Sequence, residues 1–183
     1  MSALIEAARA PSFPAQIVLV LSDEPAAAGL PTARKAGVAA EAIDYRAYPG
    51  KEAFETALDA RLLAASAEIV CLAGFMRALS PPFVERWEGR MLNIHPSLLP
   101  NLRGLHTHRR ALAHGLAEHG CTVHFVTAEL DAGPIIAQAR VRVLEGDDAD
   151  ALAARVLKEE HRIYPEALNA VARSLRAANA PET

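Results

Sequence analysis

Short hydrophobic runs alternate along this chain with segments in which hydrophobic residues recur at helical spacing. Runs at residues 16–21, 40–45, 68–73 and 91–94 are short enough for strands. Helices are expected at residues 2–9, 31–36, 51–65, 82–87, 106–115 and 148–177, the last interrupted at Tyr164-Pro165. Strands and helices that alternate in this way are typical of a doubly wound α/β fold with a mostly parallel sheet.

The pattern changes after residue 120. Residues 121–127 and 134–143 both alternate like strands, and a short loop that contains Gly133 joins them. We therefore expect an antiparallel hairpin added to the parallel sheet. The last residues, 178–183, are expected to fray.

Composition limits the classes of protein that this pattern allows. The 183 residues are 51% hydrophobic and 22% charged, which predicts one globular domain over residues 1–183. A formal charge of −3 provides no field for holding a nucleic-acid polymer. The sequence has no apolar run of membrane-spanning length and does not open on a signal peptide, so we expect no membrane partner and a cytoplasmic location. Cys71 and Cys121 lie in apolar runs and should be buried thiols.

The first candidate for chemistry is Asn93-Ile94-His95, at the end of the fourth strand. Alternation places Asn93 and His95 on one face, and ligands of such sheets bind beyond the carboxyl ends of the strands. An amide donor and an imidazole can then face one spot. The alternative is a hydrogen-bonded histidine in the core.

The second candidate is the segment 106–110, His-Thr-His-Arg-Arg. His106 and His108 could bind zinc together with His124, but the segment has neither HExxH nor CxxC spacing. We favour the alternative, in which Thr107 caps a helix and the two arginines face solvent.

The third candidate is Asp131, in the loop of the expected hairpin. In one interpretation, Asp131 and Gly133 only form the turn of a plain hairpin loop. If the loop folds back over the sheet, the Asp131 carboxylate meets His95 and raises the pKa of that imidazole, giving a cationic donor at neutral pH. The residues by themselves therefore lead to an α/β domain with an Asn/His/Asp cluster suited to stabilising an oxyanion and moving a proton.

The chain resembles the phosphoribosylglycinamide formyltransferases of purine biosynthesis from residue 2 to about residue 170. The matching segments are AGFMRALSPPFV at 73–84, LNIHPSLLP at 92–100, GLHTHRRAL at 104–112, GCTVHFVTAELDAGPIIAQA at 120–139 and EEHRIYP at 159–165. The resemblance implies direct transfer of a formyl group from the cosubstrate 10-formyltetrahydrofolate to the amine of glycinamide ribonucleotide, through a tetrahedral intermediate and with no metal. It implies three catalytic residues: Asn93 and protonated His95 would stabilise the oxyanion, and Asp131 would keep His95 cationic and help to move the proton.

The resemblance also implies binding residues for these two small-molecule substrates, in a monomer or homodimer. Those for folate are Lys51, Met76, Arg77, Ala78, Leu79, Asn93, Val126, Thr127, Ala128, Glu129, Leu130 and Asp131. Those for the ribonucleotide are Pro96, Leu157, Lys158, Glu159 and Glu160, and the active-site neighbours are His106, Thr122 and His124. Lys51 departs from the arginine that relatives often place there, so bidentate contact with the folate tail would be lost.

The chain also departs from the family pattern at its front. Family members begin with a strand and a Gly/Ser/Asn-rich turn that binds the ribonucleotide phosphate, whereas residues 1–5 align with the start of the helix that follows. We therefore expect the sheet to lack its first strand, with a loss of stability and of phosphate binding. A strand encoded upstream of Met1 is the preferred explanation, and a relative that has lost this strand is the alternative.

Three other functions remain as alternatives. A hydrolase would give the formyl group to water, and a metal-dependent enzyme would use His106, His108 and His124. A noncatalytic remnant would keep folate binding but not ribonucleotide binding.

Overall fold

The computed structural model of the protein describes residues 1–178, so most of the tail expected to fray lies outside the described residues. The elements in chain order are α1 (Ser2–Ala7), β1 (Val20–Ser22), α2 (Gly29–Lys35), β2 (Ala40–Ala42), the 3-10 turn η1 (Tyr45–Ala47), α3 (Lys51–Ala64), β3 (Val70–Leu72), α4 (Pro81–Arg86), β4 (Met91–His95), α5 (Thr107–Ala113), β5 (Glu118–Phe125), β6 (Ile135–Arg142) and α6 (Ala149–Ala178). Within residues 1–178, no helix is both long and apolar enough to cross a membrane.

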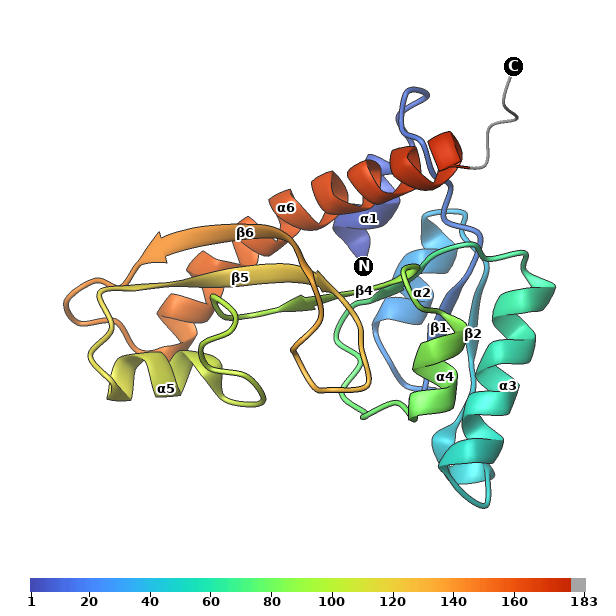
Figure 1. Ribbon diagram of the computed structural model, residues 1–183, viewed down its shortest axis with the longest axis horizontal. Coiled ribbons are helices and arrows are strands. Elements are labelled where there is room, and N and C mark those ends of the chain that lie inside the picture. The colour runs from blue at the N-terminus through green and yellow to red at the C-terminus, as the bar shows by residue number, and fades with distance from the viewer. Residues whose placement is uncertain (179–183) are drawn as a thin grey trace.

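Four of the strands form one mixed sheet in the order β3-β4-β5-β6. β3 and β4 run parallel, whereas β5 runs antiparallel to both β4 and β6. β1 and β2 form a separate parallel pair. The α/β fold with parallel strands and an antiparallel addition is confirmed, and the sheet is divided between β1 and β3 (Figure 1).

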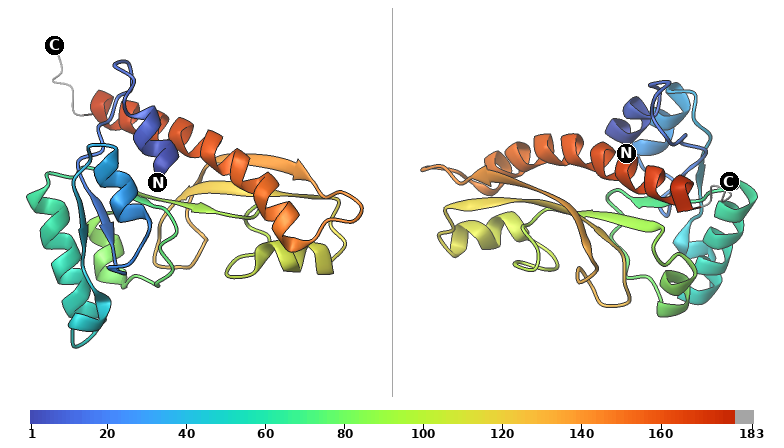
Figure 2. Two further views of the ribbon diagram at one scale, coloured as in Figure 1. Left: turned by 180° about the vertical axis from the view of Figure 1, so that it is seen from behind. Right: turned by 45° about the horizontal axis from the view of Figure 1, so that its top comes forward.

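Neighbouring residues of β4 pack into two different hydrophobic cores. Leu92 packs in a core with residues of α6, whereas Met91 packs with Phe54 of α3 and with Trp87. Both β4 side chains are fully buried. Successive side chains of a strand point to opposite faces, so helices must cover both faces of the sheet at β4. Figure 2 shows α6 lying along the sheet with α1 beside it, on the side that buries Leu92.

Three predicted strands are shorter in the structure than in the sequence pattern. β1 leaves out residues 16–19 and β2 leaves out residues 43–45. β3 leaves out residues 68, 69 and 73. Residues 16–19 form no backbone–backbone hydrogen bond within the described chain, although their composition favours a strand. A strand is defined by its partners, and hydrophobic composition alone does not supply them.

The predicted interruption of the last helix at Tyr164-Pro165 is wrong. α6 continues through Pro165, with Tyr164 and Leu168 buried on either side of it. Proline removes one helical hydrogen bond, but the apolar stripe of α6 stays packed on the sheet, and this packing outweighs the local cost. The Tyr164 hydroxyl adds a polar anchor, since its oxygen lies 2.8 Å from the Leu72 carbonyl oxygen and 3.1 Å from that of Leu92.

Tyr164→Phe tests this anchor between α6 and two strands. The change leaves two carbonyl oxygens without their hydroxyl partner, so we expect the free energy of unfolding to fall by about 1–2 kcal/mol. Urea denaturation measures the effect, with Tyr48→Phe as the control because the Tyr48 hydroxyl donates to no protein group within residues 1–178. Equal stability of the two variants would contradict the anchoring role.

Candidate functional site

Asn93 lies on β4 directly opposite His124 of β5. The Asn93 Nδ2 atom is 3.2 Å from His124 Nε2, and His124 Nδ1 is 2.8 Å from the Phe125 carbonyl oxygen. These contacts assign the proton of His124 to Nδ1, so Nε2 accepts from the Asn93 amide. Burial lowers the pKa of His124, which agrees with a neutral ring. The amide nitrogen of Asn93 carries a second hydrogen, which this arrangement leaves for a substrate.

His95 lies two residues further along β4, on the same face as Asn93, and is buried. Its Nδ1 is 3.4 Å from Asp131 Oδ2, and its Nε2 is 3.1 Å from the Leu102 carbonyl oxygen. Both ring nitrogens therefore face oxygen acceptors, an arrangement that a doubly protonated imidazole satisfies. The loop of the hairpin does fold back to His95, and in this structure His95 Nε2 faces the protein rather than an open site.

Asp131 joins two loops at this point. Its Oδ2 also accepts a hydrogen bond of 2.9 Å from the Gly104 backbone nitrogen, and its Oδ1 lies 3.8 Å from His124 Nε2. The carboxylate thus lies against both histidines while it holds the segment around Gly104. The pair Arg103–Glu129, at 2.5 Å, links the same two loops at the surface.

Backbone strain gathers around this cluster. Of the four residues other than glycine with positive φ in residues 1–178, three are Leu102, His106 and Asp131. Such conformations cost free energy and persist where the surrounding structure enforces them, often at functional sites. Gly133 adds a close approach, because a Cβ atom there would lie 1.8 Å from the Phe125 carbonyl oxygen. The path of the hairpin loop is therefore tightly specified.

Thr122, expected as a neighbour of the active site, holds the loop that follows His95. Its hydroxyl donates to the Ser97 carbonyl at 2.7 Å and accepts from the Leu99 backbone nitrogen at 3.1 Å and the Gln138 amide at 2.9 Å. The residue is fully buried and all of its hydrogen-bonding capacity is used. Thr122 thus fixes the loop geometry and leaves no donor for a ligand.

The predicted helix cap at Thr107 is wrong. The residue before the first turn of α5 is His106, which has a left-handed backbone and makes no capping hydrogen bond through its side chain. Thr107 instead donates its hydroxyl to the Pro96 carbonyl at 2.6 Å. Its hydroxyl thus serves a tertiary contact, which sequence spacing cannot reveal.

The three histidines considered for zinc make separate contacts. His108 Nδ1 lies 3.1 Å from His119 Nε2, His124 contacts Asn93, and His106 is exposed. Within the described part of the chain, no group of three or more metal-ligating side chains gathers at one point.

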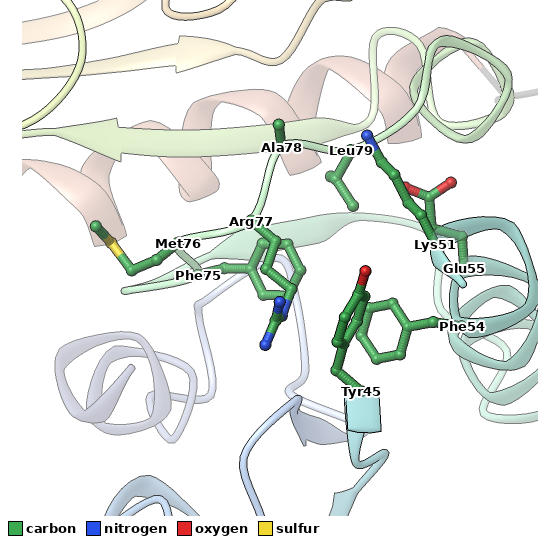
Figure 3. A pocket seen from close by; sticks show the side chains of 9 residues that line it. All are labelled: Tyr45, Lys51, Phe54, Glu55, Phe75, Met76, Arg77, Ala78 and Leu79. Atoms are coloured by element: carbon green, nitrogen blue, oxygen red, sulfur yellow. The ribbon is translucent and has the colours of Figure 1, made fainter. Parts of the chain in front are cut away.

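Five of the residues expected to bind folate line one small pocket of about 270 Å³ (Figure 3). They are Lys51 at the start of α3 and Met76, Arg77, Ala78 and Leu79 after β3. In Figure 3 the Arg77 guanidinium lies beside the Tyr45 ring, 3.7 Å from its centroid, whereas Met76 points away from the Tyr45 and Phe54 rings.

The rest of the predicted folate set lies in the hairpin loop, residues 126–131. Val126 is tied to β4, since its backbone nitrogen donates to the Met91 carbonyl at 2.9 Å. Glu129 and Leu130 are exposed, whereas Asp131 is buried. The loop therefore presents an open outer surface and a buried charged base.

The residues expected for the ribonucleotide lie in two places. Leu157, Lys158, Glu159 and Glu160 belong to α6, and Pro96 follows β4. No hydrogen bond or ion pair among residues 1–178 joins Pro96 to this stretch of α6. Glu160 is partly buried, and this burial raises the pKa of its carboxyl.

Sequence reasoning missed several residues that shape the site. Asp23 pairs with Arg77 at 2.6 Å, and Tyr45 supplies the ring under the same guanidinium. Asp23 follows β1, so the rule that ligands bind beyond carboxyl strand ends could have found it. His119, buried beside His108, carried no such signal, because it precedes the predicted strand at residues 121–127 and only the structure places it in β5.

Fold and cluster together define an α/β domain with an Asn/His/Asp constellation at a strand end. A family model described as formyl transferase matches residues 1–168. The chain therefore belongs to the formyl transferase family.

This chain matches named relatives over most of its own length, but the share of each relative that it covers differs greatly. The trifunctional purine biosynthetic protein adenosine-3 of Bos taurus is 50% identical over 172 residues, which are 94% of this chain but only 17% of that protein. Phosphoribosylglycinamide formyltransferase of Escherichia coli K12 is 47% identical over 165 residues, 90% of this chain and 78% of that protein. The crystal structure of phosphoribosylglycinamide formyltransferase from Brucella melitensis matches with a TM-score of 0.90 at 56% identity, covering 94% of this chain and 88% of that one.

The pKa of His119 predicts how the free energy of unfolding depends on pH. Burial, the largest cause, and the neighbouring histidines lower the pKa of His119 to about 4. An unfolded histidine binds its proton near pH 6.5, so the unfolded state gains more protons as the pH falls from about 6.5 to 4. The contribution to stability is therefore complete above about pH 6.5 and is lost as the pH falls toward 4.

We expect His119→Gln to reduce this pH dependence. Between pH 7 and pH 5 the free energy of unfolding of the parent should fall by about 2 kcal/mol more than that of the variant, whatever their offset at pH 7. Urea denaturation at both values measures it, and the exposed His161 provides the control change His161→Gln. An equal fall in the free energy of unfolding between pH 7 and pH 5 for the parent and His119→Gln would contradict the lowered pKa of His119.

Proposed function

We propose that this chain transfers a formyl group from 10-formyltetrahydrofolate to the amine of glycinamide ribonucleotide, giving the N-formyl product. The observation that carries the proposal is the contact network in which Asp131 lies against both His95 and His124 while Asn93 keeps one amide hydrogen free. The named relatives agree in activity, since those of Escherichia coli and Brucella melitensis bear the name of this transferase.

The reaction requires charge stabilisation at one carbon. The substrate amine attacks the formyl carbon and the carbonyl oxygen becomes an oxyanion. The amine then gives up one proton, which Asp131 helps to carry to N10 of folate. Breakdown of the tetrahedral intermediate returns the carbonyl as the bond from carbon to the protonated N10 breaks. The free amide hydrogen of Asn93 is fixed by His124 and donates to the developing oxyanion. His95, held between Asp131 and Leu102, donates in turn when its Nε2 exchanges the Leu102 carbonyl for the substrate.

Folate is assigned to the pocket of Figure 3 and the hairpin loop. The pocket has three aromatic rings, those of Tyr45, Phe54 and Phe75, and two cations, Lys51 and Arg77. Aromatic rings pack against a flat heterocycle, and cations suit the carboxylates of a folate tail. The ribonucleotide is assigned to Pro96 and to four residues of α6, which are Leu157, Lys158, Glu159 and Glu160. The proposal also includes a cytoplasmic location and a monomer or homodimer, which sedimentation would distinguish.

Substitution of Asn93 is the direct test. Asn93→Ala and His95→Ala should each lower the rate of formyl transfer by about 10²- to 10³-fold, because each removes one donor to the oxyanion. Formylated ribonucleotide is measured at saturating concentrations of both substrates, and binding of a folate analogue is measured separately. Asn169→Ala, on the exposed side of α6, is the control for a lost amide. Parental turnover in Asn93→Ala would contradict the proposal.

Three outcomes would favour the other functions. Formate release that does not need the ribonucleotide would indicate a hydrolase. Binding of the folate analogue by the parent chain, with neither ribonucleotide binding nor product, would indicate a noncatalytic folate-binding protein. Loss of activity when a chelator removes trace metal ions would favour the metal-dependent alternative with His106, His108 and His124.

A further inference from the structure

Residues 74–80, between β3 and α4, follow an irregular path beside the pocket of Figure 3. Residues 76–79 line that pocket, yet none of residues 74–79 makes a backbone–backbone hydrogen bond within the described part of the chain. Unpaired peptide groups beside a pocket are available to a ligand. They bind it well only if the segment is already held in one shape, because the ligand otherwise supplies the free energy of ordering it.

A buried carboxylate on α3 fixes the far end of this segment. Glu55 is 5% exposed, and its Oε1 accepts a hydrogen bond of 2.7 Å from the Ser80 backbone nitrogen. Its Oε2 accepts a second bond from the Ser80 hydroxyl. Ser80 in turn caps α4, since its hydroxyl oxygen accepts from the Phe83 backbone nitrogen at 3.4 Å. Glu55 therefore joins α3 to the point at which the irregular segment enters α4.

The other contacts of the segment are made by its side chains. Phe75 and Leu79 pack against the core that α3 shares with β4, and Arg77 is held through its guanidinium. Among the described residues, the bond from the Ser80 nitrogen to Glu55 is the only hydrogen bond that joins a backbone group of this segment to another element. A hydrogen bond fixes the direction of a peptide group, whereas apolar packing of side chains is non-directional.

We propose that Glu55 is a positioning residue for folate binding, because its hold on Ser80 sets the direction of the peptide groups of residues 76–79. The proposal rests on the proposed function, since it takes folate as the ligand of this pocket. A flat heterocycle with donors and acceptors along its edge suits a row of fixed peptide groups. Glu55 lies outside the Asn93 cluster, so its loss should weaken folate binding and leave the chemical step unchanged once folate is bound.

Glu55→Ala tests the proposal by removing both bonds to Ser80. We expect KM for 10-formyltetrahydrofolate and Kd for its product, tetrahydrofolate, each to rise by about tenfold, because folate must then order the segment. At saturating folate, kcat and KM for the ribonucleotide should stay within about twofold of the parent. Steady-state kinetics gives kcat and both KM values, and titration calorimetry gives Kd.

Two further variants separate the bonds of Glu55 from its charge. Glu55→Gln keeps the length of the side chain, and its amide can accept from the Ser80 nitrogen and donate to the hydroxyl oxygen. Glu55→Asp keeps the charge but is one carbon shorter, so it cannot reach both groups. We expect near-parental folate affinity in Glu55→Gln and a loss of severalfold in Glu55→Asp. The opposite order would overturn the proposal, and this pair also decides it if Glu55→Ala does not fold.

Asp59→Ala is the matched control for a lost carboxylate between α3 and α4. Asp59 is also buried, one turn further along α3, and it bonds the Trp87 indole nitrogen at 3.0 Å and the Arg86 guanidinium at 2.9 Å. This variant loosens the same two helices without removing a bond to Ser80, so we expect parental folate affinity. Parental affinity in Glu55→Ala would overturn the proposal, and so would an equal loss in Asp59→Ala.

The parent chain distinguishes failure of this proposal from failure of the proposed function. Formyl transfer by the parent, with unchanged folate affinity in Glu55→Ala, overturns the positioning role alone. Binding of tetrahydrofolate by the parent without formyl transfer contradicts the proposed function, and the Kd values of the variants then still decide the role of Glu55. A parent that does not bind tetrahydrofolate overturns both.

Discussion

The burial of β4 on both faces is the constraint on which the rest of the structure depends. Met91 and Leu92, adjacent on this strand, are fully buried in two different cores, so β4 cannot shift its register by one residue without exposing both sets of neighbours. That register places Asn93 opposite His124 and His95 opposite Thr122. The geometry of the polar cluster thus follows from hydrophobic packing one residue away.

The polar cluster uses its four titratable or amide groups for different purposes. His124 is held neutral by burial and by its bond to a carbonyl, so it can fix the Asn93 amide as an acceptor. His95 has acceptors at both nitrogens and suits a cation. Asp131 lies against both rings and also holds Gly104, so one carboxylate couples the charge of the site to the shape of two loops. Loop strain at Leu102, His106 and Asp131 is maintained by these same contacts.

The division of the sheet shows how pairing, rather than composition, defines a strand. Residues 16–21 have strong strand composition, yet only the last part belongs to β1, because one edge of this segment faces a cavity. α6 shows the opposite effect, since it continues through Pro165 where local preference favours an interruption. In both segments tertiary contacts, present or missing, override the local pattern.

The sequence by itself determined the α/β alternation, the antiparallel addition, the shared face of Asn93 and His95, and the family resemblance, because periodicity and short motifs are local properties. Only the tertiary structure decided that Asp131 reaches His95 across the hairpin loop, that Thr107 bonds Pro96 instead of capping α5, and that Asp23 and Tyr45 hold Arg77. Each of these contacts joins residues from different elements, and their distance in space depends on how the whole chain packs.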